Sequence, residues 1–414
     1  MGVNEKVIHV YADWSNTSPT LMGKLYVDTV RGNELFSFEY EKNWLKTSKS
    51  SFIFDPDLCF YEGRQYVPLD KSLFGAFSDS CPDRWGRLLM KRKEAIEAKA
   101  EGRKPRTLKE IDFLLGVHDK TRIGALRFSL EENGLFLSAD DNFSVPPWTK
   151  LRTLEAASIN YENDKVEEEK WLKQLLAPGS SLGGARPKAS VLAPDNSLWI
   201  AKFPSRNDEW NSGTWEIVTH NLAAKCGLRV PNTKLLTFSD NGGTFLVERF
   251  DRNKTQRIHF SSAMTLLGKT DGEGSEGTSY LDIASFIKSN GASPKGDLRE
   301  LWKRIVFSIA VSNTDDHLRN HGFLLTPQGW VLSPLYDVNP NIYGDTLSLN
   351  INELDNTLSF DLALETVAFY EIDLEEAKSI ITDMKKIISN NWQQIAINYG
   401  LSKSEIDRME MVFI

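Results

Sequence analysis

The chain has 414 residues, 41% of them hydrophobic and 26% charged, a composition typical of a globular protein with a large buried core. Its formal net charge of −8 at pH 7 argues against a protein that coats nucleic acid over its whole surface. The N-terminus has no apolar signal core, and no run approaches about 18 apolar residues, so we expect a cytoplasmic protein with no membrane contact. Cys59, Cys81 and Cys226 lack metal-ligand spacing, and we expect them to be free thiols.

The first third of the chain has the pattern of a mixed α+β module. Alternating or β-rich stretches predict strands at residues 7–11, 23–27 and 35–40. A helix is predicted to start at Ser80-Cys81-Pro82-Asp83, and a shorter one covers 108–117. Residues 123–128 and 135–138 flank Glu132-Asn133-Gly134 and predict a β-hairpin. We place the boundary of this module at residue 145.

A glycine-containing loop follows two predicted helices, at 150–158 and 164–177. Gly183 and Gly184 would let backbone N–H groups approach phosphate oxygens, and Lys188 would add positive charge. The signal is weak alone, because a Gly-Gly pair between a helix and a strand is usually only a turn. The loop is also not a Walker A motif, whose spacing it lacks.

Lys202 ends an otherwise apolar strand that is predicted to pair with the strand at 189–193. Kinase folds place an ATP-phosphate lysine on such a strand and pair it with a helix glutamate, for which Glu216 is available. The alternative is a lysine that keeps an edge strand soluble. Further strands at 235–238 and 244–251 complete a predicted small lobe, residues 146–255.

Helical patterns dominate residues 256–414, which we predict to be an α-rich C-terminal lobe. Within it, Asp315 and Asn320 are five residues apart, and Asp337 follows an apolar hairpin-like segment. Phosphoryl transfer needs such a set, since one carboxylate orients the attacking hydroxyl while an Asn and a second carboxylate hold Mg²⁺. The alternative is a polar turn between a helix and a strand.

Taken in order, these motifs resemble the HipA-type serine/threonine kinases, the toxins of bacterial HipA–HipB toxin–antitoxin pairs. The resemblance covers nearly the whole chain and predicts a two-lobed, protein-kinase-like α+β fold with an N-terminal module. It rests on five segments, which are Phe77 to Arg84, Ser181 to Lys188, Val247 to Arg252, Asn313 to Asn320 and Leu332 to Asp337.

The resemblance implies a role for each matched position. Asp315 would be the catalytic base, Asn320 and Asp337 would bind Mg²⁺, and Lys202 would contact the ATP phosphates. The backbone of Glu248 and Phe250 would hold adenine, and Asp251 could reach the ribose. The loop that covers the phosphates would consist of Gly183, Gly184, Ala185, Arg186 and Lys188. Ser181 aligns with the autophosphorylated serine, but Ser180 precedes it, so both are candidates.

We therefore expect an ATP- and Mg²⁺-dependent serine/threonine protein kinase that arrests growth by phosphorylating a translation component. The resemblance implies a protein substrate, with an aminoacyl-tRNA synthetase as one candidate, and a HipB-like helix-turn-helix antitoxin as partner. DNA contact would be mostly indirect, through that antitoxin. Two alternatives are a small-molecule phosphotransferase, which would not need the N-terminal module, and a mainly non-catalytic corepressor subunit. The sequence assigns no role to Asp316 and His317.

Overall fold

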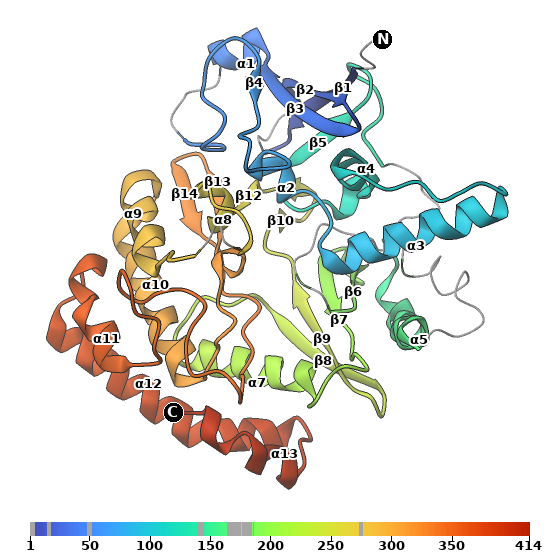
Figure 1. The fold of residues 1–414 in the computed structure, drawn as a ribbon. Coiled ribbons are helices and arrows are strands. Elements are labelled where there is room, and N and C mark those ends of the chain that lie inside the picture. The colour runs from blue at the N-terminus through green and yellow to red at the C-terminus, as the bar shows by residue number, and fades with distance from the viewer. Residues whose placement is uncertain are drawn as a thin grey trace. The chain divides into compact units, whose positions relative to one another are not determined.

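A computed structural model describes residues 5–14, 18–47, 52–138, 145–163, 175, 184, 186–272 and 276–414 (Figure 1). The chain forms two compact units. Unit 1 comprises Met1–Arg206 and Asp251–Ser261, and unit 2 comprises Asn207–Phe250 and Ser262–Ile414. The predicted small lobe thus contributes residues to both units, and the three-part division at residues 145 and 255 stays a prediction.

Unit 1 contains a five-stranded antiparallel sheet with the strand order β4-β3-β2-β1-β5. Apolar residues on one face of the strands, such as Ile8, Val10 and Phe38, are buried together with Phe77 and Leu114 from the helices. The strands are β1 (Lys6–Ala12), β2 (Thr20–Val30), β3 (Asn33–Tyr40), β4 (Gln65–Tyr66) and β5 (Leu126–Ser129). The helices α1 (Lys42–Thr47), α2 (Gly75–Ser78) and α4 (Glu110–Gly116) accompany this sheet.

The prediction of a β-hairpin formed by residues 123–128 and 135–138 was wrong. β5 pairs with β1, so that Val10 lies opposite Phe128, whereas residues 135–138 are described but form no strand. Pairing with β1 buries Phe128 completely, while Leu135 remains 84% exposed. The burial of apolar surface on a distant strand therefore outweighed the local turn signal at Glu132 to Gly134.

The predicted helix start at Asp83 is confirmed. Asp83 is the N-cap of α3 (Arg84–Ala100), and its side chain accepts a hydrogen bond of 2.8 Å from the Gly86 N–H. Trp85 packs with Tyr161 of α5 (Leu151–Glu162) in a second, smaller core. The predicted strand pair is also present, as the antiparallel hairpin of β6 (Lys188–Leu192) and β7 (Leu198–Lys202).

Unit 2 begins with α7 (Ser212–Lys225), which packs against the hairpin of β8 (Thr233–Ser239) and β9 (Gly242–Glu248). A Cβ at Gly213 would lie only 2.1 Å from the carbonyl oxygen of Gly243. The close approach of this helix to its hairpin therefore requires glycine.

The remaining elements of unit 2 include the C-terminal helices, where the rings of Trp392 and Phe413 are stacked with centroids 4.8 Å apart. These elements are α8 (Ala263–Leu266), α9 (Tyr280–Asn290), α10 (Pro294–Ala310), β13 (Gly322–Thr326), β14 (Gly329–Leu332), α11 (Phe360–Glu365), α12 (Leu374–Asn398) and α13 (Lys403–Arg408). Short strands β10 (Arg252–Asn253), β11 (Gln256–Arg257) and β12 (Phe260–Ser262) lie at the junction of the units in sequence. In the described part of the chain, no helix combines the length and apolar character needed to cross a membrane.

Candidate active site

The Asp-Asn loop of unit 2 connects α10 to β13. After α10 ends at Ala310, the backbone turns at Ser312, whose φ of 48° is in the left-handed region. Asp315 is exposed, and Leu318–Asn320 form a single 3-10 turn before β13. The apolar hairpin-like segment that was predicted to follow the loop is confirmed, as the antiparallel pair of β13 (Gly322–Thr326) and β14 (Gly329–Leu332).

Residues 333–341, which follow β14, lie beside this loop. The Tyr336 hydroxyl donates a hydrogen bond of 2.6 Å to the Arg319 carbonyl, so the residues next to Asp337 and Asn320 are directly joined. The backbone N–H of Asn339 donates to Asn313 Oδ1 at 3.1 Å, and that of Asn341 donates to the Ser312 carbonyl at 3.0 Å. The three predicted residues Asp315, Asn320 and Asp337 thus belong to two adjacent segments.

Helix α10 fixes the start of the second segment. Arg304 has no exposed surface, and its guanidinium donates to the Ser333 carbonyl at 2.6 Å and to Glu300 at 3.0 Å. Asp297 accepts a hydrogen bond of 2.9 Å from the Leu332 N–H. The buried guanidinium holds the chain through its Nη2 where the segment toward Asp337 begins.

The oxygen atoms of Asn320 and Asp337 suit a magnesium ion. The Asn320 amide nitrogen donates 2.9 Å to the Asp315 carbonyl, so its Oδ1 is the amide atom that would coordinate a cation. Asp337 is half-buried, with a left-handed φ of 57°. Within the described ranges, no three His, Cys, Asp or Glu side chains are grouped to hold a metal. Magnesium usually needs only one or two carboxylates, because water and substrate phosphates supply its other ligands.

Asp316, to which the sequence assigned no role, belongs to the same loop as Asp315, but its side chain is buried. It contacts Tyr280, Ser308 and His321. Burial raises the pKa of Asp316, but the nearby His321 and the hydrogen bond from Tyr280 lower it by more, so the pKa lies below its ordinary value. No sequence signal distinguished this buried aspartate from its exposed neighbour, Asp315.

The predicted phosphate loop belongs to unit 1 and is described only in part. Ser180, Ser181, Gly183 and Ala185 lie outside the described residues. Gly184 has a left-handed φ of 102°, and a Cβ there would lie 2.6 Å from Lys188 Nζ. The left-handed backbone at this position favours glycine.

Lys188 is buried, and its Nζ forms an ion pair of 3.1 Å with Asp83. Burial raises the pKa of Asp83, while the charge of Lys188 lowers it, with a net increase. Asp83 thus caps α3 and pairs with a lysine far along the chain. Sequence reasoning found the cap but missed the pair, because nothing in the local pattern indicates a partner so distant.

Lys188 and Lys202 lie directly opposite each other on the β6–β7 hairpin, so their side chains extend from the same face. Like charges in this position are destabilising unless anions are near, and Asp83 supplies one. Arg186 is close to the same end of the hairpin, with its guanidinium 3.5 Å from the Phe203 carbonyl. The predicted Lys202–Glu216 pair joins residues of different units and stays a prediction.

The residues predicted to contact adenine, Glu248 and Phe250, lie at the end of β9 and just after it. The Glu248 N–H donates to the Asn232 carbonyl at 2.9 Å, and its carboxylate accepts from the Asn232 amide at 2.6 Å. The ring of Phe250 lies 5.6 Å from that of Tyr336, which links this segment to the segment of Asp337. Their adenine contacts stay a prediction.

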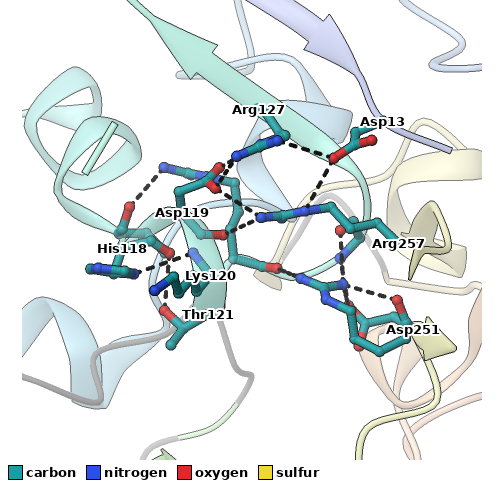
Figure 2. A network of polar contacts seen from close by, with 12 residues as sticks. Asp13, His118, Asp119, Lys120, Thr121, Arg127, Asp251 and Arg257 are labelled. Atoms are coloured by element: carbon teal, nitrogen blue, oxygen red, sulfur yellow. Dashed lines mark hydrogen bonds and ion pairs between the residues drawn. The ribbon is translucent and has the colours of Figure 1, made fainter. Parts of the chain in front are cut away.

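Asp251 is an anchor within unit 1. Its carboxylate is buried, and Oδ2 accepts hydrogen bonds of 2.7 Å from the Gly124 N–H and from Arg252 (Figure 2). These contacts fasten residues 251–261 to the N-terminal module. The predicted contact of Asp251 with the ribose stays a prediction.

Asp119 holds a second part of the same network (Figure 2). Its carboxylate accepts hydrogen bonds from Arg127 at 2.6 Å and from Arg257 at 2.9 Å. Burial raises the pKa of Asp119, but the charge of Arg257 and the hydrogen bond from Arg127 lower it below its ordinary value. The carboxylate is therefore ionised in the folded protein at neutral pH.

Comparison with known proteins gives consistent matches. The family model of the HipA-like C-terminal domain matches residues 180–392. A putative kinase of Haemophilus influenzae is 27% identical over 260 residues, which cover 57% of this chain and 71% of that protein. The serine/threonine-protein kinase toxin HipA of Shewanella oneidensis is 24% identical over 232 residues, 48% of this chain and 52% of that protein.

The fold has a counterpart among solved structures. The HipA chain in the complex of Shewanella oneidensis HipA, HipB and operator DNA matches with a TM-score of 0.66 at 16% identity, covering 98% of this chain and 94% of that one. At this identity the likeness shows the fold alone. It confirms the predicted α+β class, a two-lobed kinase-like fold with an N-terminal module and an α-rich C-terminal lobe.

Proposed function

The chain belongs to the family of the HipA-like C-terminal domain and is a HipA-type kinase, and from this premise we propose that it transfers the γ-phosphoryl group of ATP to a serine or threonine hydroxyl of a protein. The observation that carries the proposal is the hydrogen bond from Tyr336 to the Arg319 carbonyl. It joins the segment of Asp337 to the segment of Asp315 and Asn320, which supports a shared site for the base and the metal ligands of phosphoryl transfer.

In this proposal each residue has a defined task. Asp315 orients the acceptor hydroxyl and takes up its proton as the oxygen bonds to the γ-phosphorus, while the bond from the γ-phosphorus to the β–γ bridging oxygen breaks and ADP leaves. Asn320 and Asp337 hold Mg²⁺, which neutralises phosphate charge when it is bound. Lys202 contacts the phosphates, and the loop of Gly183, Gly184, Ala185, Arg186 and Lys188 covers them. Glu248 and Phe250 hold adenine through their backbone, and Asp251 is proposed for the ribose.

The Asp83 pair refines the role of the two lysines. Because Lys188 already has a buried carboxylate partner, part of its charge is compensated within unit 1. Lys202 is proposed as a cationic contact for the phosphates, and Lys188 as a residue that shares its charge between Asp83 and the phosphate loop. Both assignments keep the positive charge on one face of the β6–β7 hairpin.

We propose a helix-turn-helix antitoxin of the HipB type as partner, with DNA contacted mostly through it. The solved relative was crystallised as a complex of HipA, HipB and operator DNA, which supports this partner. The proposed substrate is a protein of the translation machinery, with an aminoacyl-tRNA synthetase as a candidate, and its phosphorylation would make the protein a growth-arresting toxin.

The direct test is transfer of label from γ-labelled ATP to the purified full-length chain. We expect label on the protein in the presence of Mg²⁺ and none after chelation with EDTA, because positioning by the metal is required for the transfer. Addition of excess Mg²⁺ to the chelated sample should restore the label. Absence of label under all three conditions, together with no transfer to lysate proteins, would contradict the kinase proposal.

The site of self-labelling is expected in the loop before Lys188. Ser181→Ala should remove the label if Ser181 is the acceptor, and Ser180→Ala is the matched control from the adjacent position. Phosphopeptide mass spectrometry of both variants and of the double variant identifies the modified residue. Label that persists in the double variant would place the acceptor outside this pair.

A further inference from the structure

Asp315 and Asp316 are consecutive carboxylates in opposite surroundings. Asp315 is exposed, as a residue that meets a substrate hydroxyl must be, whereas Asp316 is only 2% exposed. Burying an ionised carboxylate is costly unless hydrogen bonds and opposite charge compensate for it. A buried aspartate in a loop next to the proposed base therefore needs an explanation.

The partners of Asp316 come from three different parts of unit 2. The Tyr280 hydroxyl at the start of α9 donates to Oδ2 at 2.6 Å, and the Ser308 hydroxyl of α10 donates to it at 3.3 Å. His321, just before β13, has Nε2 3.0 Å from Oδ1. The Asp316 carboxylate thus connects the loop to helices α9 and α10 and to His321 at the end of the loop.

The tyrosine contact is the strongest of these. Tyr280 has no exposed surface, and burial and the neighbouring Asp316 raise its pKa far above the ordinary value, so that the hydroxyl keeps its proton and remains a donor. The bond is short, as expected for a hydroxyl that donates to a carboxylate. The Tyr280 ring also meets the His321 ring edge-on, with centroids 5.6 Å apart.

The loop needs anchoring because little regular structure holds it. It contains the left-handed Ser312 and a single 3-10 turn. Ser308 holds the loop through two hydrogen bonds, because its hydroxyl donates to Asp316 and also accepts a bond of 3.2 Å from the Asn313 amide. Asn313 Oδ1 in turn accepts a hydrogen bond from the Asn339 N–H. Side-chain contacts from a rigid scaffold fix such a loop in one geometry.

We propose that Asp316 is a positioning residue for the kinase reaction, which holds the loop so that Asp315 meets the acceptor hydroxyl, with the Tyr280 hydroxyl as its principal support. The inference rests on the function proposed above and adds residues that do not touch the substrate. Their effect reaches the reaction through the backbone of residues 315–320, whose internal hydrogen bond joins Asn320 to the Asp315 carbonyl.

The chain offers a matched control in Tyr370. Like Tyr280 it is fully buried in unit 2, and its 3-10 turn packs against α9. Its hydroxyl forms no hydrogen bond with any described residue. Tyr280→Phe and Tyr370→Phe therefore remove the same atom from similar surroundings, but only the first removes a bond to Asp316.

The experiment compares initial rates of label transfer from γ-labelled ATP in the full chain across ATP concentrations. We expect Tyr280→Phe to lower the saturating rate about 10-fold to 100-fold while leaving the half-saturating ATP concentration near the wild-type value, because a small displacement of the reacting groups affects the chemical step. Tyr370→Phe should keep the wild-type rate. Ser308→Ala, which removes the longer bond to Asp316 and also the bond from the Asn313 amide, should lower the saturating rate as well.

A second readout does not depend on activity. Hydrogen exchange of residues 313–321 should be faster in Tyr280→Phe than in Tyr370→Phe, measured on the full chain without nucleotide. Equal rates and equal exchange in the two phenylalanine variants would overturn the positioning role while leaving the kinase proposal intact. A wild-type chain that transfers no label would overturn the kinase proposal and the positioning role with it.

Discussion

Replacing Asp315 by asparagine is expected to lower the rate of ATP-dependent label transfer by about 10²- to 10⁴-fold. Asparagine is nearly the same size and can still accept a hydrogen bond, but it cannot take up the proton of the attacking hydroxyl. Asp315 is exposed, and its carbonyl, which accepts from the Asn320 amide, is unchanged by the substitution. We therefore expect the fold to remain intact, as measured by circular dichroism and the denaturation midpoint.

The control for this variant is Asp383→Asn, which neutralises another exposed carboxylate of unit 2, within α12. It should transfer label at the wild-type rate, because one exposed surface charge outside the two loop segments changes such a reaction little. If Asp315→Asn also keeps the wild-type rate, Asp315 is not the base. The role would then fall to another group of the loop.

Replacing Asp119 by alanine is expected to destabilise unit 1 by about 3–5 kcal/mol, which is the usual cost of removing one partner of a buried ion pair. Arg257 has only 9% of its side chain exposed and Arg127 only 21%, so both guanidinium groups would lose their closer carboxylate in a place that water scarcely reaches and would keep only the longer contacts with Asp13, of 3.3 and 3.5 Å. The measurement is unfolding in urea, which, unlike guanidinium chloride, does not screen ion pairs.

The same network predicts the direction of the pH dependence. The pKa of Asp119 is lower in the folded than in the unfolded chain, where it is about 3.9. Its contribution to stability is therefore fully present above the unfolded value and is lost as the pH falls through the folded value. Asp119→Ala should be less acid-sensitive than the wild type over this range.

Asp70→Ala is the control for Asp119→Ala, because it removes an exposed carboxylate of the same unit. It should change the stability by less than about 0.5 kcal/mol. An Asp119→Ala midpoint equal to that of Asp70→Ala would show that the arginines find other partners and that the network contributes little.

The elements that sequence reasoning predicted well are those with a local cause. The cap at Asp83, the strand pair ending in Lys202, and the helices α9, α10 and α12 each follow from a residue or a period that acts within a few positions. The positions of Asp315 and Asn320 in a loop after a helix were predictable for the same reason.

What sequence reasoning missed depends on distant pairing. β5 pairs with β1 because this pairing buries apolar residues such as Phe128, and the turn pattern at Glu132 to Gly134 carries no information about that burial. Asp316 and Asp315 are the same residue type in adjacent positions, and only the folded surroundings make one a buried anchor and the other an exposed group. The Asp83–Lys188 pair likewise requires knowledge of which segments meet.

The path of the chain between the two units has a consequence for synthesis on the ribosome. Residues 207–250 belong to unit 2, yet Asp251 and Arg257, which complete the anchors of Gly124 and Asp119, are translated after them. Unit 1 therefore cannot complete the buried polar contacts of Gly124 and Asp119 at the time when residue 206 emerges from the exit tunnel. Until residues 207–257 have been made, the nascent N-terminal portion lacks the hydrogen bond from Arg257 to Asp119 and the one from the Gly124 N–H to Asp251.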